Sequence, residues 1–292
     1  MLQGRTSLQN PWGFVMSGHS RFSEGYIDLI QIGACSQRVG ENPRAIEIAM
    51  KTNAKPTDNL KALEQELIKL ANDQHDSYAY EHLFTIPLTV ARVRLHHLQK
   101  SLWVLNRREC WAYAQATAPF DVKQLIWDHE REELHGDQER DMGNHYELEI
   151  QQGEPFELYP EDYASAIPSD GTLTCLHAWT HLAKDSPWLK TFAASAALEM
   201  TNSEEILRKG GASRRMAQRI EEDLGITINR QQSYKEHIIA DVAHANIMME
   251  VAQRHAQTKP ARQLVLEGAR ESWAIDRIYR DNLASLMEAH TG

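Results

Sequence analysis

Cysteine is scarce in this chain, and the few cysteines present exclude two common ways of stabilising a small domain. The sequence of 292 residues contains three of them, Cys35, Cys110 and Cys175, which are odd in number and far apart. A disulfide framework needs paired cysteines, and a structural zinc site usually needs closely spaced ones, as in CxxC. Neither is indicated, so we expect a protein of the reducing cytoplasm.

Long apolar runs and an excess of basic residues are also missing. Residues 1–20 contain Arg5, Pro11 and several polar side chains, so we expect neither a signal peptide nor a membrane span. The formal net charge of -10 disfavours a nucleic acid as the main partner, because binding phosphates needs a concentrated basic surface. No glycine-rich phosphate loop or nicotinamide fingerprint occurs either. The expected partner is therefore a small-molecule substrate, with no nucleic acid and no membrane.

Alternating strand patterns are absent, whereas apolar residues recur at helical spacing along most of the chain. This pattern predicts helices at about 88–116, 121–135, 173–184, 188–200, 213–223, 234–257 and 261–289, with an N-cap at Asp121. Residues 1–56 are rich in Gly and Pro, which predicts an irregular arm that packs on the core. Residues 57–292 are expected to form one helical domain, so the fold class is all-α, a helical bundle.

The most informative motif is residues 237–244, which read His-Ile-Ile-Ala-Asp-Val-Ala-His. On a helix, His237, Asp241 and His244 stand at i, i+4 and i+7 and share one face. That face continues into Met248 and Val251, so the three ionisable groups point toward apolar packing. A carboxylate buried between two imidazoles is costly unless a cation or hydrogen bonds compensate it, and a bound metal would do so.

Other carboxylates lie where helix phase predicts burial. Glu199 is the only charged residue in a run of small and apolar residues, and Glu109 extends an apolar stripe on its own helix. Glu132 and Glu133 belong to a helix that closes with His135. Taken singly, each has a surface or hydrogen-bonding role as its alternative. Together, carboxylates and imidazoles from separate helices favour iron or manganese over structural zinc, and the HExxH motif is absent. Several other histidines, such as His75, His255 and His290, are expected to face water.

The order of these motifs resembles that of the haem-oxygenase-like di-iron oxidases and oxygenases, which are related in fold to thiaminase-type and pyrroloquinoline-quinone-synthase-type proteins. The shared features are a helix with one Glu, a helix with Glu followed by a glycine-containing turn and His-x2-Leu, a third helix with Glu, and His-x3-Asp-x2-His. The resemblance covers roughly residues 75–257. It implies a haem-oxygenase-like helical bundle in which residues 57–292 form the di-metal domain.

The resemblance also implies a set of seven metal ligands on four helices. These are Glu109, Glu133, His145, Glu199, His237, Asp241 and His244. The second helix leaves a choice open, because Glu132 and His135 form a competing pair at i, i+3. Local helix geometry favours that pair, whereas the His145-Tyr-Glu-Leu148 segment favours Glu133 with His145, which we adopt.

Two ferrous ions, with manganese as an alternative at one site, are the cofactors that this resemblance implies, with O2 as co-substrate. The implied reactions on a small molecule are N-oxygenation of an amine, desaturation and oxidative carbon–carbon cleavage. Reducing equivalents would come from an external electron donor or from the substrate, and a homodimer is expected by resemblance alone. One alternative is a metal-free, thiaminase-like hydrolase that uses Cys110 or Cys175 as its nucleophile. Another is a non-enzymatic helical interaction protein with buried polar networks.

Overall fold

The structure is a computed structural model that describes residues 58–136, 142–244 and 246–290, with their side chains except at 239–244. The expected N-terminal arm, residues 1–56, lies outside the described residues. The first half of the described chain contains α2 (Asp58–His75), α3 (Tyr78–Thr85), α4 (Val90–Thr117), α5 (Phe120–His135), α6 (His145–Gly153), η1 (Glu154–Phe156) and α7 (Pro160–Ala164). The second half contains α8 (Asp170–Asp185), α9 (Trp188–Glu199), η2 (Met200–Asn202), α10 (Ala212–Leu224), η3 (Ile228–Arg230), α11 (Gln232–His244), α12 (Ile247–His255) and α13 (Lys259–Ala289).

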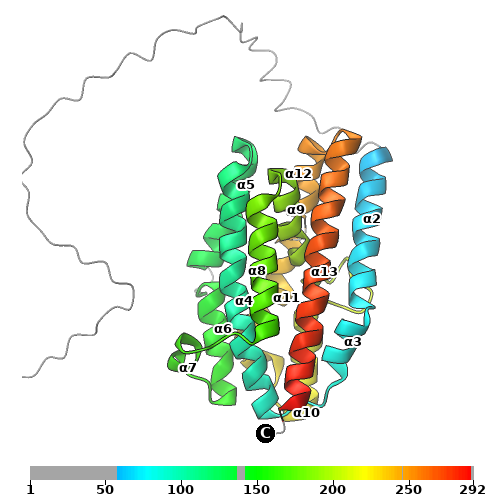
Figure 1. Cartoon of the computed structure of the whole chain (residues 1–292). Helices are drawn as coiled ribbons and strands as arrows, with labels where there is room; N and C mark the ends of the chain where they lie inside the picture. Colours follow the sequence, from blue (N-terminus) through cyan, green and yellow to red (C-terminus); the bar gives the residue numbers. More distant parts are fainter. Residues whose placement is uncertain (1–57, 137–141, 245, 291–292) are drawn as a thin grey trace, which may run out of the picture. The chain divides into compact units, whose positions relative to one another are not determined.

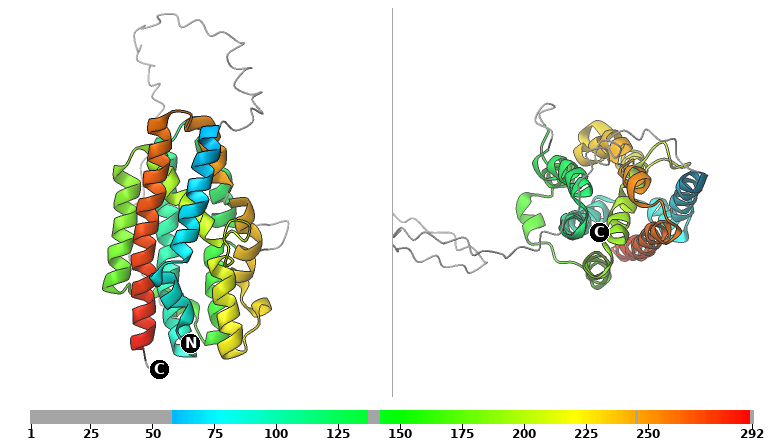
Figure 2. Two further views of the ribbon diagram at one scale, coloured as in Figure 1. Left: turned by 90° about the vertical axis from the view of Figure 1, so that its right-hand side faces the viewer. Right: turned by 90° about the horizontal axis from the view of Figure 1, so that it is seen from above.

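The long helices lie alongside one another in a bundle (Figure 1), and no strand occurs in this part of the chain. Helix α9 packs against α4, α8, α11, α12 and α13, and the end-on view of Figure 2 shows the other helices arranged around it. Every residue from Thr191 to Leu198 is buried, as expected for a helix that is surrounded on all sides. The predicted all-α bundle is confirmed. Within the described residues, no helix combines the length and apolarity needed to cross a membrane.

A glycine explains how closely α13 approaches α9. A Cβ atom added at Gly268 would lie 2.3 Å from the backbone oxygen of Lys190 and 3.1 Å from the Cβ of Ala193. Only glycine leaves space for this contact. The small side chains of α9 and Gly268 therefore bring the two backbones together along the first half of α9.

Two details of the helix predictions are wrong. Helix α5 begins one residue earlier than its predicted cap: Pro119 occupies the N-cap position, and Asp121 lies in the first turn, where it accepts a hydrogen bond from His255 at 2.9 Å. The single helix predicted over 234–257 is two helices, because α11 ends at His244 and α12 begins at Ile247. Met248 and Val251 are buried, and they belong to α12, not to the helix of the His-Asp-His motif.

His75 does not face water, as its polarity had suggested. Its ring is 2% exposed and stacks on Tyr80 with 4.4 Å between centroids, and among the described residues neither ring nitrogen has a hydrogen-bond partner. Burial, and then the nearby Arg215 guanidinium, lower the pKa of His75 to about 3. The folded protein therefore holds this imidazole neutral, whereas the unfolded chain protonates it below about pH 6.5.

The buried His75 predicts a specific dependence of stability on pH. The contribution of the neutral His75 ring to the free energy of unfolding is fully present above pH 6.5 and decreases as the pH drops toward 3. Between pH 8 and pH 5 the protein should lose about 2 kcal/mol of unfolding free energy that a His75→Phe variant does not lose. Urea unfolding at both pH values measures this difference. The exposed His181, changed to Phe, is the control, and equal losses in wild type and His75→Phe would contradict the assignment.

Candidate metal centre

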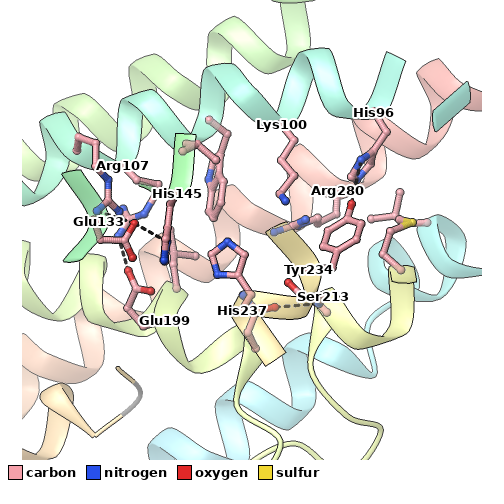
Figure 3. A pocket seen from close by; sticks show the side chains of 18 of the residues that line it. His96, Lys100, Arg107, Glu133, His145, Glu199, Ser213, Tyr234, His237 and Arg280 are labelled. Carbon is pink, nitrogen blue, oxygen red and sulfur yellow. Dashed lines mark hydrogen bonds and ion pairs between the residues drawn. The ribbon is translucent and has the colours of Figure 1, made fainter. Parts of the chain in front are cut away.

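A partly open cavity of about 50 Å³ lies inside the bundle. Its wall is built by residues of α3, α4, α5, α6, α9, η2, α10, α11 and α13. The polar side chains in the wall are His96, Lys100, Arg107, Arg108, Glu133, His145, Glu199, Asn202, Ser213, Tyr234, His237 and Arg280. Four of the seven ligands that the sequence implies are among them, namely Glu133, His145, Glu199 and His237. Figure 3 shows Glu133, His145 and Glu199 toward one side of the cavity, with His237 next to them near its middle.

Carboxylates and an imidazole converge at this end. One ligand atom from each of His129, Glu133 and Glu199 lies within 4.8 Å of the other two. His129 and Glu133 stand at i and i+4 on α5 and so share a face, and Glu199 comes from the end of α9. His129 Nε2 lies 3.7 Å from Glu199 Oε1 and 4.0 Å from Glu133 Oε1. An imidazole with two carboxylates is a ligand set that suits iron or manganese.

Two more imidazoles extend this group. His145 Nδ1 lies 2.8 Å from Glu133 Oε2, and the rings of His145 and His237 meet edge to face with 4.8 Å between centroids. His145 is the first residue of α6, which a capping box formed by Asn144 and Glu147 fixes in place. The glycine-containing connection that leads to His145 thus returns the chain to the face of Glu133.

Arginines on α4 compensate the acidic charge. Arg108 Nη1 lies 2.9 Å from Glu133 Oε2 and 2.8 Å from Glu130 Oε1, and Arg107 Nη2 lies 3.8 Å from Glu199 Oε1. Burial by itself raises the pKa of Glu133, but Arg108 and His145 hold it well below its usual value. Glu133 is therefore an ionised, buried carboxylate that is available to a metal cation.

The structure does not bring Glu109 to this centre. Glu109 is exposed, because it is one residue, and thus about 100° of helix rotation, beyond the cavity-lining Arg108. Glu132 and His135, the competing pair on α5, are also exposed, whereas Glu133 and His145 are buried.

The remaining implied ligands, Asp241 and His244, belong to α11, but their side chains lie outside the described residues. Sequence reasoning missed His129, Glu130 and Arg108. Only the i, i+4 relation between His129 and Glu133 could have pointed to one of them.

A second buried polar group adjoins the cavity. Glu149 of α6 is completely buried and lies 2.8 Å from His97 Nδ1 and 2.6 Å from Lys100 Nζ. Lys100 also sits over the ring of Tyr234, 4.3 Å from its centroid, and Tyr234 Oη lies 3.5 Å from His96 Nδ1. This network fixes the positions of Lys100 and Tyr234 in the cavity wall.

The cysteines are poorly placed for catalysis. Cys110 and Cys175 are both buried and are not among the residues that line the cavity. Burial raises the pKa of Cys110, and it raises that of Cys175 to about 11. Both side chains are therefore thiols, not thiolates, at neutral pH.

Solved structures with the same fold come from several bacteria. A CADD-like protein of unknown function from Nostoc punctiforme has 17% sequence identity and a TM-score of 0.60, and the match covers 79% of this chain and 99% of that one. A domain of unknown function with a haem-oxygenase-like fold from Shewanella denitrificans has 14% identity and a TM-score of 0.62, with 80% and 95% covered. A TenA homologue from Pseudomonas syringae has 13% identity and a TM-score of 0.57, with 81% and 96% covered. At these identities the likeness shows the fold alone, which is haem-oxygenase-like.

The sequence has a family match of its own. No curated protein matches it. A family model described as iron-containing redox enzyme matches residues 94–277, which include α5, α6, α9 and α11. Because this match spans more than half of the chain and agrees with the fold, the chain belongs to the family of iron-containing redox enzymes with a haem-oxygenase-like fold.

Proposed function

We propose that this protein is a non-haem di-iron oxidase or oxygenase that uses O2 to oxidise a small molecule. The observation that carries the proposal is the convergence of Glu133, His145 and Glu199 at one end of a cavity, with His237 beside His145. Membership of an iron-containing redox family gives these residues their expected metal. Candidate reactions are N-oxygenation of an amine, desaturation and oxidative carbon–carbon cleavage.

The proposed ligand set differs from the sequence-based one by one residue removed and one added. Glu133, His145, Glu199, His237, Asp241 and His244 are retained, Glu109 is left out because it is exposed, and His129 is added because of its distances to Glu133 and Glu199. The donors are oxygen and nitrogen atoms, which suit two ferrous ions, or one iron and one manganese. When bound, a ferrous pair would supply two electrons to dioxygen.

The chain's own residues would position these ligands and limit access of water. Trp111 donates its indole N–H to Glu199 Oε1 at 3.2 Å, and Arg108 holds Glu133. Groups that orient a metal ligand raise its affinity for the metal and fix its geometry. Most polar side chains of the cavity wall are buried, which would limit the access of bulk water to the oxidising step. Further electrons would come from an external donor or from the substrate.

The two alternative functions have less support. A thiaminase-like hydrolase would need a reactive cysteine, but the thiols of Cys110 and Cys175 have raised pKa values and lie outside the cavity wall. If the buried polar groups had a purely structural role, the cluster of His129, Glu133 and Glu199 would have no metal ion to bind.

Iron analysis of the full chain tests the proposal. Protein purified from iron-supplemented cells should contain two iron ions per chain, and anaerobic ferrous loading followed by O2 should give a transient visible absorption band. Asp241→Ala and Glu199→Ala should lose the iron and the band, whereas Glu109→Ala should keep both because that side chain is exposed. Wild-type protein that binds no iron would refute the proposal. Catalytic activity of the metal-free protein that depends on Cys110 or Cys175 would support the hydrolase alternative. An Asp241→Ala variant that keeps iron but is less stable would support a structural role for Asp241.

A further inference from the structure

The cavity has a second polar end, on the far side of His237 from Glu133 and Glu199. Figure 3 shows Arg280, Tyr234, Ser213 and His96 at this end, with Lys100 above. These side chains come from α4, α10, α11 and α13. Whereas the Glu133 end offers carboxylates, this end offers mainly hydrogen-bond donors, so the two ends of one cavity differ in chemistry.

Arg280 is the strongest of these donors. Its Nε donates to Asp276 Oδ1 at 3.1 Å, and Asp276 Oδ2 also accepts hydrogen bonds from Gln74 and Tyr80. Among the residues that the structure describes, no acceptor is found for the two Nη atoms of Arg280, which lines the cavity with its side chain 11% exposed. One edge of the guanidinium is thus fixed, and the other is available to a planar anion.

Neighbouring groups complete a site for an acceptor. The Nε1–H of Trp103, another residue of the cavity wall, is buried and has no acceptor among the described residues. Burial keeps the pKa of Tyr234 well above its usual value, so its phenol remains protonated and can donate. A buried donor without an acceptor costs free energy, which a bound ligand with acceptor oxygens would recover.

The charges of the cavity wall favour an anionic ligand in the cavity once metal is bound. Without metal, Arg108 and Arg107 compensate Glu133 and Glu199. Divalent ions on these carboxylates would leave Arg107 and Arg108 as positive charges in the cavity wall, in addition to Lys100 and Arg280, whose charges Glu149 and Asp276 balance. In a site of low dielectric such an excess attracts an anionic ligand.

From these observations we propose that Arg280, with Lys100, Trp103 and Tyr234, binds the carboxylate of the substrate and directs the rest of the molecule toward Glu133 and Glu199. The substrate class is therefore a small carboxylic acid. That the bound acid is a substrate rests on the proposed function. Binding of the acid does not, because it can be measured separately from any reaction.

Calorimetric titration of the full chain tests this inference, with iron content measured on the same samples. Butanoate and the uncharged butanamide are the probes, each added to anaerobic ferrous-loaded protein. Butanoate should bind at millimolar concentration or below, and butanamide about tenfold more weakly, because it lacks the charge that Arg280 recognises. Arg280→Gln should weaken butanoate binding about tenfold while the iron content stays unchanged.

Arg254→Gln is the matched control, because Arg254 also pairs with a carboxylate four residues earlier but lies on the surface. Tyr234→Phe is a second variant, which keeps the test decisive if Arg280→Gln does not fold. It removes one hydrogen-bond donor and should also weaken butanoate binding. Equal binding of acid and amide, or no binding of either, would overturn the inference. Butanoate binding that requires iron but is unchanged in Arg280→Gln would also overturn the inference, since the carboxylate would then coordinate the metal. Loss of iron from wild type would instead count against the proposed function.

Discussion

Glu133→Ala is expected to remove most of the iron from this protein. Glu133 faces His145 at 2.8 Å and Arg108 at 2.9 Å, and it is the carboxylate that joins the α5 and α6 sides of the cluster. Loss even of a group that only supports a ligand typically costs about 10- to 100-fold in metal affinity, so loss of a direct ligand should cost at least that. Iron per chain, measured after gel filtration of ferrous-loaded protein, gives the result.

The adjacent residue provides a control of the same chemistry. Glu132 is exposed, so Glu132→Ala should keep the iron content of wild type. Glu133→Ala should also lower stability toward the lower end of about 3–5 kcal/mol, because Arg108 would lose one of its two close carboxylates and keep Glu130, with Glu199 further away. If Glu132→Ala loses iron and Glu133→Ala retains it, the alternative pair at i, i+3 holds the metal instead.

Helix α5 shows which part of this site the sequence could predict. Its buried positions, Ile126, His129, Glu130 and Glu133, follow helical spacing, so the choice of Glu133 over Glu132 agrees with helix phase as well as with the family pattern. The all-helical architecture was predictable for the same reason. Helical spacing shows which residues lie on the same face of a helix. On α5, the face that carries Glu133 is the buried one.

Helix α4 shows where such reasoning fails. The sequence suggests that an apolar stripe through Leu105 and Glu109 is buried, yet both residues are exposed. The face that is buried carries His97, Lys100 and Arg107. A helix that lines a polar cavity has charged residues on its buried face. The hydrophobic periodicity of such a helix therefore predicts the wrong face to be buried. The cations on α4 become intelligible only when Glu133 and Glu149, which come from other helices, are seen beside them.

Glu149→Gln is expected to destabilise the fold strongly without touching the proposed ligands. Glu149 is completely buried and accepts contacts from His97 at 2.8 Å and Lys100 at 2.6 Å. Glutamine keeps the shape but removes the charge, which leaves the Lys100 ammonium buried without a carboxylate. Breaking a buried pair in this way costs about 3–5 kcal/mol, which urea unfolding can measure. The exposed pair Glu66–Arg270 provides the control, because Glu66→Gln there should cost less than about 1 kcal/mol.

The same variant should change how stability depends on acid. Burial by itself raises the pKa of Glu149, but Lys100 and His97 favour the charged form more strongly, and its pKa lies far below the usual value. The unfolded chain binds this proton near pH 4.3, so the stabilisation by Glu149 is complete above that pH and is lost progressively below it. The difference in unfolding free energy between wild type and Glu149→Gln should therefore be constant from pH 6 to pH 8 and shrink below about pH 4.3. A difference that stays constant into the acid range would mean that Glu149 supports the fold through its shape and hydrogen bonds, and not through its charge.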